Sequence, residues 1–369
     1  MAAELEHLDV AVAGGGPIGL ASAWRAAQRG LRVAVVDSGA PGAWEVAAGM
    51  LAPASEAEYG EDALSRLGLR SRERFPAFCA ELREASGIDP ELRAHGTLAV
   101  ARDRDEAEAL ERMLAYRRGL GLAVERLRPS QARRAEPALA PTVRLALDVP
   151  GDTSVDPRRL VAALRAAAQG AGVTLVDGTV EALLDGGGLR LAGGRELRAE
   201  QVVLATGATA LAPEVPVRPV KGQVLRLRDP HGPGLVQRTI RGNGCYLVPR
   251  DDGRYVLGAT MEERGHDLAP TAGGVYELLR DMSEVVPGVL ELEIEELRAG
   301  LRPATPDNLP AVGPGARPGV AFATGHFRNG ILLTPLTAEL VAATLTGEAL
   351  PEWASAIDPR RFARVEAAA

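Results

Sequence analysis

Hydrophobic residues follow two periods along this chain, and the first 37 residues contain both. An apolar run over 8–13 predicts a buried strand, and a second run over 31–36 predicts another. Between the two runs lie a glycine cluster and a segment that we interpret as a helix. Strand, glycine turn, helix and strand in this order are typical of a parallel nucleotide-binding sheet, so this start predicts an α/β fold.

Helices and strands alternate through most of the remaining chain. We predict helices over 62–85, 105–119, 157–170, 275–284 and 331–346. We predict strands over 97–101, 143–149, 173–176, 201–205, 223–227, 245–249, 255–259, 292–297 and 319–324. Asp156 is the expected N-cap of the third helix, with Pro157 at its first position.

The middle of the chain differs from its two ends. Residues 217–301 are mostly strands, whereas the segments before and after them return to strand–helix pairs. We therefore expect two discontinuous domains: a nucleotide-binding domain from 1–85, 150–215 and 300–369, and a substrate-binding domain from 86–149 and 216–299.

The glycine cluster over 14–19 fits the fingerprint G-x-G-x-x-G. Gly14 permits a tight turn, Gly16 lets the backbone approach a pyrophosphate, and Gly19 lets the helix pack close to the strand. The helix N-terminus adds free N–H donors, and Asp37, about 20 residues further on, can accept from ribose hydroxyls. This context favours a dinucleotide site over a turn without a ligand, but it does not distinguish FAD from NAD.

Composition narrows the function classes. A net charge of -7 over 369 residues disfavours a nucleic-acid partner, and no apolar run is long enough for a membrane span. The two cysteines, Cys79 and Cys245, are far apart, so neither a disulfide framework nor a metal site is expected. Residues 1–6 are acidic, unlike a signal peptide, and we expect a cytoplasmic protein. Lys221 is the only lysine, which we interpret as compositional bias.

A second glycine-bounded loop, residues 325–330, joins a predicted buried strand to the last predicted helix. Backbone N–H groups and the positive end of a helix dipole at such a loop would stabilise the negative edge of a reduced flavin. NAD enzymes have no such need, so the loop favours FAD, although turns of this kind also occur without a ligand.

Five segments together resemble the D-amino-acid oxidase family of FAD-dependent amine oxidoreductases, and most closely its glycine oxidase branch, which serves thiamine biosynthesis. They are the glycine fingerprint and the segments 48–53, 244–250, 300–307 and 325–333. The resemblance covers nearly the whole chain. It implies a two-domain α/β (α+β) fold, in which a glutathione-reductase-type Rossmann domain binds FAD and a discontinuous substrate domain carries a mixed, largely antiparallel sheet.

The resemblance also implies which residues contact FAD. Asp37 stands where many relatives have Glu, and Val180 would contact the adenine through its backbone. The full set of implied cofactor residues is Gly14, Gly16, Pro17, Ile18, Gly19, Asp37, Ser38, Ala48, Gly49, Met50, Leu51, Val180, Thr206, Gly207, His326, Phe327, Arg328, Asn329, Gly330 and Ile331. Gly300 stands about where the sarcosine oxidase branch links its flavin through cysteine, so non-covalent FAD is expected.

An amino-acid substrate needs a planar, permanently charged fork for its carboxylate, which arginine supplies. By resemblance, Arg302 is this fork, in a turn after a strand that ends near residue 299, and Arg328 is a second charge. Tyr246 would donate its O–H to the carboxylate, and Met261, ending the strand over 255–260, would line the pocket. From the residues alone, a solvated surface charge is the favoured interpretation of each arginine, a half-buried strand residue that of the tyrosine, and a core residue is the alternative for the methionine. The resemblance reverses the interpretation of the arginine and the tyrosine.

The implied reaction is oxidation of glycine, sarcosine or small D-amino acids by hydride transfer from Cα to flavin N5. It needs orientation of the substrate and no protein base, so no acid–base residue is nominated. The imine would hydrolyse to glyoxylate and ammonia or pass to a thiazole synthase, and oxygen would be reduced to hydrogen peroxide. The resemblance further suggests a homo-oligomer. Gly244, where some relatives have histidine, leaves the substrate preference open.

Two other functions stay open at this point. One is a D-amino-acid dehydrogenase that passes electrons to a quinone, and the other is a non-catalytic, flavin-binding redox sensor. A nicotinamide dehydrogenase is disfavoured, because no second fingerprint is visible and the C-terminal loop suits a flavin.

Overall fold

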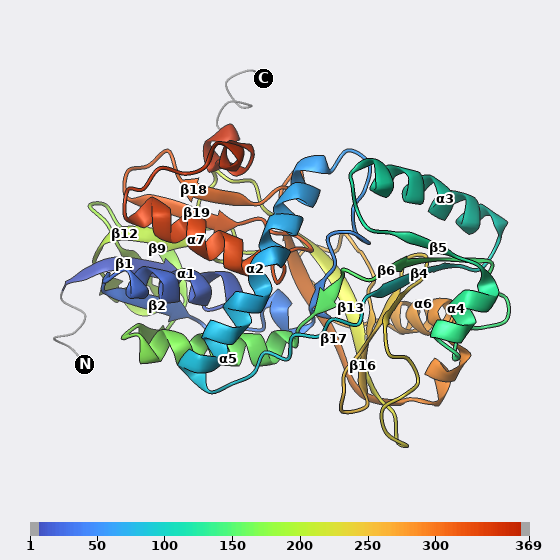
Figure 1. The fold of residues 1–369 in the computed structure, drawn as a ribbon. Helices are drawn as coiled ribbons and strands as arrows, with labels where there is room; N and C mark the ends of the chain where they lie inside the picture. Colours follow the sequence, from blue (N-terminus) through green and yellow to red (C-terminus); the bar gives the residue numbers. More distant parts are fainter. Residues whose placement is uncertain (1–6, 363–369) are drawn as a thin grey trace.

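The structure is a computed structural model that describes residues 7–362, so residues 1–6 and 363–369 lie outside it. The described chain forms two large sheets placed side by side, each with helices packed on it (Figure 1). Among residues 7–362, every helix is too short or too polar to cross a bilayer.

A six-stranded sheet occupies the left of Figure 1, with strand order β18-β19-β12-β1-β2-β8. Five strands are parallel, and β18 runs antiparallel to β19 at one edge. The strands are β1 (Leu8–Ala13), β2 (Val33–Asp37), β8 (Thr174–Asp177), β12 (Ala199–Leu204), β18 (Ala311–Pro314) and β19 (Val320–Thr324). β1 and β2 are buried along nearly their whole length, because both faces of a parallel sheet are covered.

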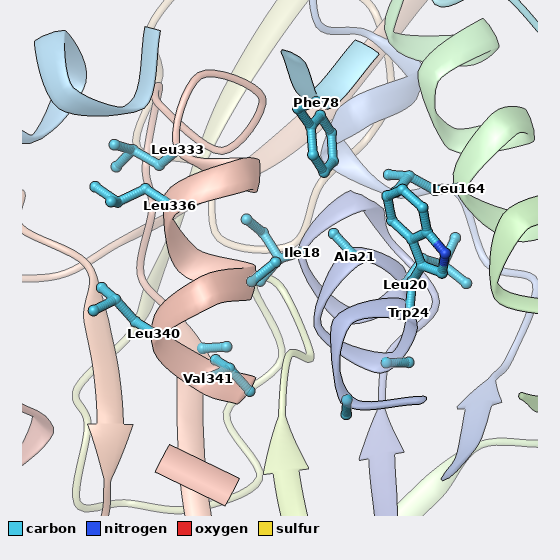
Figure 2. Packing of buried hydrophobic residues seen from close by; sticks show 14 of the residues in the cluster. Ile18, Leu20, Ala21, Trp24, Phe78, Leu164, Leu333, Leu336, Leu340 and Val341 are labelled. Atoms are coloured by element: carbon cyan, nitrogen blue, oxygen red, sulfur yellow. The ribbon is translucent and has the colours of Figure 1, made fainter. Parts of the chain in front are cut away.

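Helices α1, α2, α5 and α7 form the layer over one face of this sheet (Figure 1). Their bounds are α1 (Pro17–Gln28), α2 (Asp62–Ser86), α5 (Pro157–Gly170) and α7 (Thr334–Leu345). In Figure 2, Ile18 of α1 lies toward α7, while Trp24 lies beside Leu164 of α5. Trp24 also packs edge-on against Phe78 of α2, with ring centroids 5.9 Å apart. This packing fixes the position of α1 behind the glycine fingerprint.

A small three-stranded sheet packs against the opposite face through Leu189 and Leu197. It consists of β9 (Val180–Leu183), β10 (Leu189–Leu191) and β11 (Glu196–Leu197). A two-stranded pair, β3 (Met50–Leu51) and β7 (Thr153–Ser154), lies separately.

The eight-stranded sheet has the order β17-β13-β16-β15-β14-β4-β6-β5 and is antiparallel except where β14 meets β4. Its strands are β4 (Thr97–Ala101), β5 (Glu125–Leu127), β6 (Leu145–Val149), β13 (Arg218–Arg228), β14 (Thr239–Arg241), β15 (Tyr246–Pro249), β16 (Arg254–Gly258) and β17 (Glu293–Ala304). Helices α3 (Arg104–Gly119), α4 (Pro129–Ala135) and α6 (Ala272–Ser283) accompany it in the right half of Figure 1.

Most predicted elements are present within a few residues of their expected bounds, and Asp156 caps α5 by accepting from the N–H groups of Arg158 (2.8 Å) and Arg159 (3.1 Å). Two expectations are wrong. β17 continues to Ala304, so Arg302 lies within a strand, opposite Val220 of β13, and not in a turn. The proline that suggested a turn is tolerated because β17 is an edge strand.

The second error concerns the last helix, α7, which begins at Thr334 and not at Ile331. Residues 331–333 form a turn, in which the Leu333 N–H donates to the Asn329 carbonyl over 2.8 Å. Pro335 then occupies the first turn of the helix, where its missing N–H costs nothing. The residue boundaries of the two domains stay a prediction.

Candidate active site

A cavity of about 520 Å³ is lined by segments from both large sheets. Most of the residues expected at the site line it, although they come from widely separated parts of the chain. They are Gly14, Gly16, Pro17, Ile18, Asp37, Ser38, Ala48, Gly49, Met50, Val180, Thr206, Gly207, Tyr246, Arg302, His326, Phe327, Arg328, Gly330 and Ile331.

The glycine turn after β1 leaves this part of the wall free of side chains. Gly14 has φ 110°, and a Cβ there would overlap the carbonyl of Ala205. Gly16 caps α1 without a side-chain hydrogen bond, and the first turn of α1 contains no acidic residue. The first N–H groups of α1 and its positive dipole end are therefore available to an anion.

Asp37 ends β2 at the cavity, as the fingerprint requires. One of its carboxylate oxygens pairs with the guanidinium of Arg165 on α5 at 3.1 Å, and the side chain is 28% exposed. Arg165 also lines the cavity, so the acidic position has a cationic neighbour that the sequence did not indicate.

Residues 46–50 form a second wall of the cavity, and backbone contacts hold them. The Gly49 carbonyl accepts from the Val155 N–H over 2.9 Å, and a Cβ on Gly49 would overlap the Val155 carbonyl. Arg250, directly after β15, is buried and donates from Nη2 to the Ala48 carbonyl over 2.7 Å. The buried guanidinium thus connects the eight-stranded sheet to this wall.

The loop after β19 is the third wall. Phe327 adopts a left-handed conformation, φ 47°, and its N–H donates to the Pro303 carbonyl over 2.8 Å. His326 is 3% exposed, and its Nε2 lies 2.9 Å from Thr337 Oγ1. Burial lowers the pKa of His326 to about 3, so the ring is neutral at physiological pH and anchors the loop to α7.

Several N–H groups of this loop have no backbone acceptor. Within residues 7–362, the N–H groups of Arg328, Gly330 and Ile331 donate to no backbone carbonyl, and all three residues line the cavity. Unpaired donors grouped in one loop form a concave site for the negative edge of a ligand. The loop can therefore supply these donors although α7 begins further on than expected.

Arg302, Arg328 and Tyr246 line the same cavity. Arg302 Nη1 donates to the Thr260 carbonyl (3.1 Å) and weakly to that of Lys221 (3.4 Å), and no carboxylate of residues 7–362 forms an ion pair with either arginine. Burial, and secondarily the charge of Arg328, lower the pKa of Arg302, so a bound anion would be stabilised there.

Two glycines make room for these side chains. A Cβ on Gly222 of β13 would overlap the guanidinium of Arg302, and one on Gly258 of β16 would lie 2.5 Å from the Tyr246 hydroxyl. Burial raises the pKa of Tyr246, which keeps its hydroxyl protonated and able to donate.

Four expected site residues do not line the cavity. Gly19 lies beneath the turn, where a Cβ would overlap the Gly14 carbonyl, and Leu51 is fully buried in the core. Asn329 is buried in the loop. Met261 is 65% exposed and lies beyond β16, which ends at Gly258, so the structure does not place it in the pocket.

The lining also contains residues that the sequence analysis did not nominate. Gly222 and Val224 follow the period of two along β13, which could have indicated them once the cavity face was known. Further lining residues come from a short helical turn after β2 (residues 43–45) and from loops, among them Trp44, Glu45, Val46, Ala47, Glu56, Thr179, His266 and Leu268, while Arg165 lies on α5 and Leu301 and Pro303 lie on β17.

The lining fits FAD. The uncapped start of α1 and the side-chain-free turn at Gly14 suit a pyrophosphate, Asp37 suits a ribose, and the N–H groups of Arg328, Gly330 and Ile331 suit the polar edge of an isoalloxazine. No cysteine lines the cavity in the described residues, because both Cys79 and Cys245 are free and buried elsewhere.

Comparison with known proteins agrees with this geometry. Residues 9–344 match the DAO family of FAD-dependent oxidoreductases. The chain belongs to this family, and it is an FAD-dependent oxidoreductase whose two-domain α/β fold is the predicted one. The prediction of FAD as cofactor is confirmed.

Individual proteins are also similar to this chain over most of its length. The glycine oxidase of Geobacillus kaustophilus is 39% identical over 349 residues, which cover 90% of this chain and 92% of the relative. The crystal structure of glycine oxidase from Geobacillus kaustophilus superimposes with a TM-score of 0.91 at 37% identity, covering 96% of this chain and 99% of that one. The bifunctional protein ThiO/ThiG of Trichormus variabilis is 38% identical over 90% of this chain, which spans only 52% of that relative.

Proposed function

We propose that this protein is an amino-acid oxidase that oxidises glycine and other small amines, including sarcosine and small D-amino acids. The products are an imine, which water converts to glyoxylate and ammonia in the case of glycine, and hydrogen peroxide from oxygen. Relatives that carry the name glycine oxidase over nearly the whole chain support this proposal.

One observation carries the substrate class: two guanidinium groups, Arg302 and Arg328, share a cavity with the Tyr246 hydroxyl and pair with no carboxylate in the described part of the chain, residues 7–362. Charges of the same sign in a partly buried site favour an anion, and a carboxylate fits the planar fork of arginine. The absence of a side chain at Gly222 leaves the guanidinium of Arg302 unobstructed.

The chain's residues orient the substrate and need transfer no proton. Arg302 would hold the carboxylate, Tyr246 would donate its O–H to the same group, and Arg328 would add charge beside the loop donors. FAD, when bound, supplies the two-electron acceptor. His326 is neutral and bonded to Thr337, which supports a role in shaping the loop and none as a base.

Further parts of the proposal follow from the family and the relatives. FAD is held non-covalently, since Gly300 offers no side chain for a thioether link. The ThiO/ThiG relatives support a thiazole synthase as recipient of the imine in thiamine biosynthesis. We further propose a cytoplasmic homo-oligomer that has neither a membrane nor a nucleic acid as partner.

The test is an anaerobic titration of the purified yellow protein with glycine, sarcosine, D-alanine and D-proline. Bleaching of the flavin absorbance by glycine or sarcosine, followed by rapid recovery and peroxide release in air, is the expected result. Bleaching with slow recovery in air would instead indicate a quinone-linked dehydrogenase, and no bleaching by any of the four would overturn the proposal.

A further inference from the structure

Lys221 is the only lysine among the 42 basic residues of the chain, and it is completely buried. Its Nζ donates to Asp267 Oδ2 over 2.7 Å and to the Ala269 carbonyl over 2.6 Å. Because the remaining 41 of these 42 residues are arginines, a single buried lysine suggests that this position has a specific role. The Asp267 carboxylate and the Ala269 carbonyl accept two of the three N–H groups of this compact ammonium.

The side chain of Lys221 belongs to the face of β13 opposite the cavity. Gly222 and Val224 line the cavity, so Lys221 and Gln223, one position away from each, point to the other side. Gln223 bonds there to Glu262 Oε1 (2.7 Å) and, through its Oε1, accepts from the Thr271 N–H (2.8 Å). Lys221 is therefore not placed to touch FAD or substrate.

Both side chains hold one segment, residues 260–271, which we name the strap. The strap contains no helix, and its residues after Thr260 are exposed, apart from a half-buried Glu262. Its backbone pairs with β13 at Lys221, through the N–H and carbonyl of Glu262 (2.9 and 3.0 Å), and at Gln223, whose carbonyl accepts from the Thr260 N–H over 3.3 Å. A segment without buried apolar contacts depends on such polar bonds for its order.

The strap contributes to the cavity at two points. His266 and Leu268 are part of the lining, and the Thr260 carbonyl accepts from Arg302 Nη1 over 3.1 Å. The bonds of Lys221 to Asp267 and Ala269 flank Leu268 on both sides. Loss of the ammonium would therefore release the part of the strap that lines the cavity, while the backbone of β13 stays paired.

We propose that Lys221 is a positioning residue that, through Asp267 and Ala269, closes the strap over the substrate cavity and keeps Arg302 aimed at the substrate carboxylate. The substrate part of this inference rests on the proposed function. The closure itself is a property of the protein and can be measured without substrate.

The experiment compares Lys221→Met and Asp267→Asn with Arg238→Met in the FAD-loaded protein. Arg238 forms an ion pair with Asp148 at 2.5 Å next to the same sheet and does not line the cavity, so it controls for loss of an internal ion pair. Asp267 is 47% exposed, so Asp267→Asn tests the contact even if Lys221→Met fails to fold.

The first measurement is limited trypsin digestion without substrate, followed by mass spectrometry. The strap offers one exposed site, Arg264, and cleavage there should become about tenfold faster in Lys221→Met and Asp267→Asn but not in Arg238→Met. Unchanged cleavage in both strap variants would overturn the closure, whatever the enzyme oxidises.

The second measurement separates kcat from KM for the amino acid that bleaches the flavin. Both strap variants should raise KM about tenfold with kcat changed less than about threefold, and the double variant should match the single ones. Faster cleavage with an unchanged KM would support the closure of the strap by Lys221. It would overturn the second part of the proposal, that this closure positions Arg302.

Discussion

The cavity has a cofactor wall, which would hold FAD, and a substrate wall, which would hold the amino acid. The two walls differ in the kind of group that they offer to a ligand. The turn at Gly14, the start of α1 and the loop over 325–331 offer backbone groups to a ligand, and each is a continuous piece of chain. Tyr246 and Arg302 offer side chains from two strands that are not even neighbours in the sheet. A backbone site can therefore be recognised from a local motif, whereas a side-chain site depends on how the strands pair.

The largest effect should come from disturbing the backbone site. Gly14→Val would place a branched side chain against the Ala205 carbonyl at a φ that valine cannot adopt, so FAD binding should be lost, as measured by flavin absorbance per protein. Gly30→Ala, also at positive φ but in open space, should keep its flavin and lose about 1 kcal/mol of stability. Retention of flavin by Gly14→Val would contradict the assignment of the Gly14 turn as a binding site for FAD.

The next effect tests the side-chain site. Arg302→Lys keeps the charge but removes the bidentate fork, so kcat/KM for the substrate should fall by about 100-fold, mainly through KM, with flavin content unchanged. Arg228→Lys, at a 58% exposed position on β13, should leave kcat/KM unaffected. Loss of flavin in Arg302→Lys would show that the two walls are not separable.

The pH dependence of stability tests the loop over 325–331, which belongs to the cofactor wall. His326 has a folded-state pKa of about 3, below the ordinary value of 6.5, so the unfolded chain binds a proton between these values and the folded protein does not. The unfolding free energy should therefore fall by about 2 kcal/mol from this residue alone between pH 7 and pH 5.

Urea melts at pH 7 and pH 5 measure this change, with His326→Gln as the comparison, since glutamine does not titrate. The variant should lose about 2 kcal/mol less than the parent protein over this range. An equal loss in both proteins would mean that the ring is not buried in its neutral form.

The smallest expected effect is that of Tyr246→Phe. It removes one hydroxyl from a strand position whose ring packing is unchanged, which corresponds to about 1 kcal/mol, or a fivefold to tenfold rise in KM. Steady-state kinetics with the same substrate measure it. A change in kcat alone would contradict a role in holding the carboxylate.

The errors of the sequence analysis lie mostly on the substrate side. Arg302 was expected in a turn because Pro303 follows it, but pairing with β13 extends the strand through both residues. Met261 was expected in the pocket, but β16 ends early and the residue lies in the strap, which the polar side chains of β13 hold. Lys221 was interpreted as compositional bias, and only its burial shows that it has a specific partner.

The sequence by itself determined the dinucleotide-binding turn, because the turn geometry, the helix start and the acidic end of β2 are set by residues close together in the chain. The family and the FAD cofactor were indicated by the resemblance of five segments, of which this turn is only one. The tertiary structure decided the rest. It brought Arg302, Arg328 and Tyr246 into one cavity, added Arg165 beside Asp37, and gave the strap its only buried cation. These contacts join distant segments, and strand register and burial, which no local pattern specifies, determine which side chains meet.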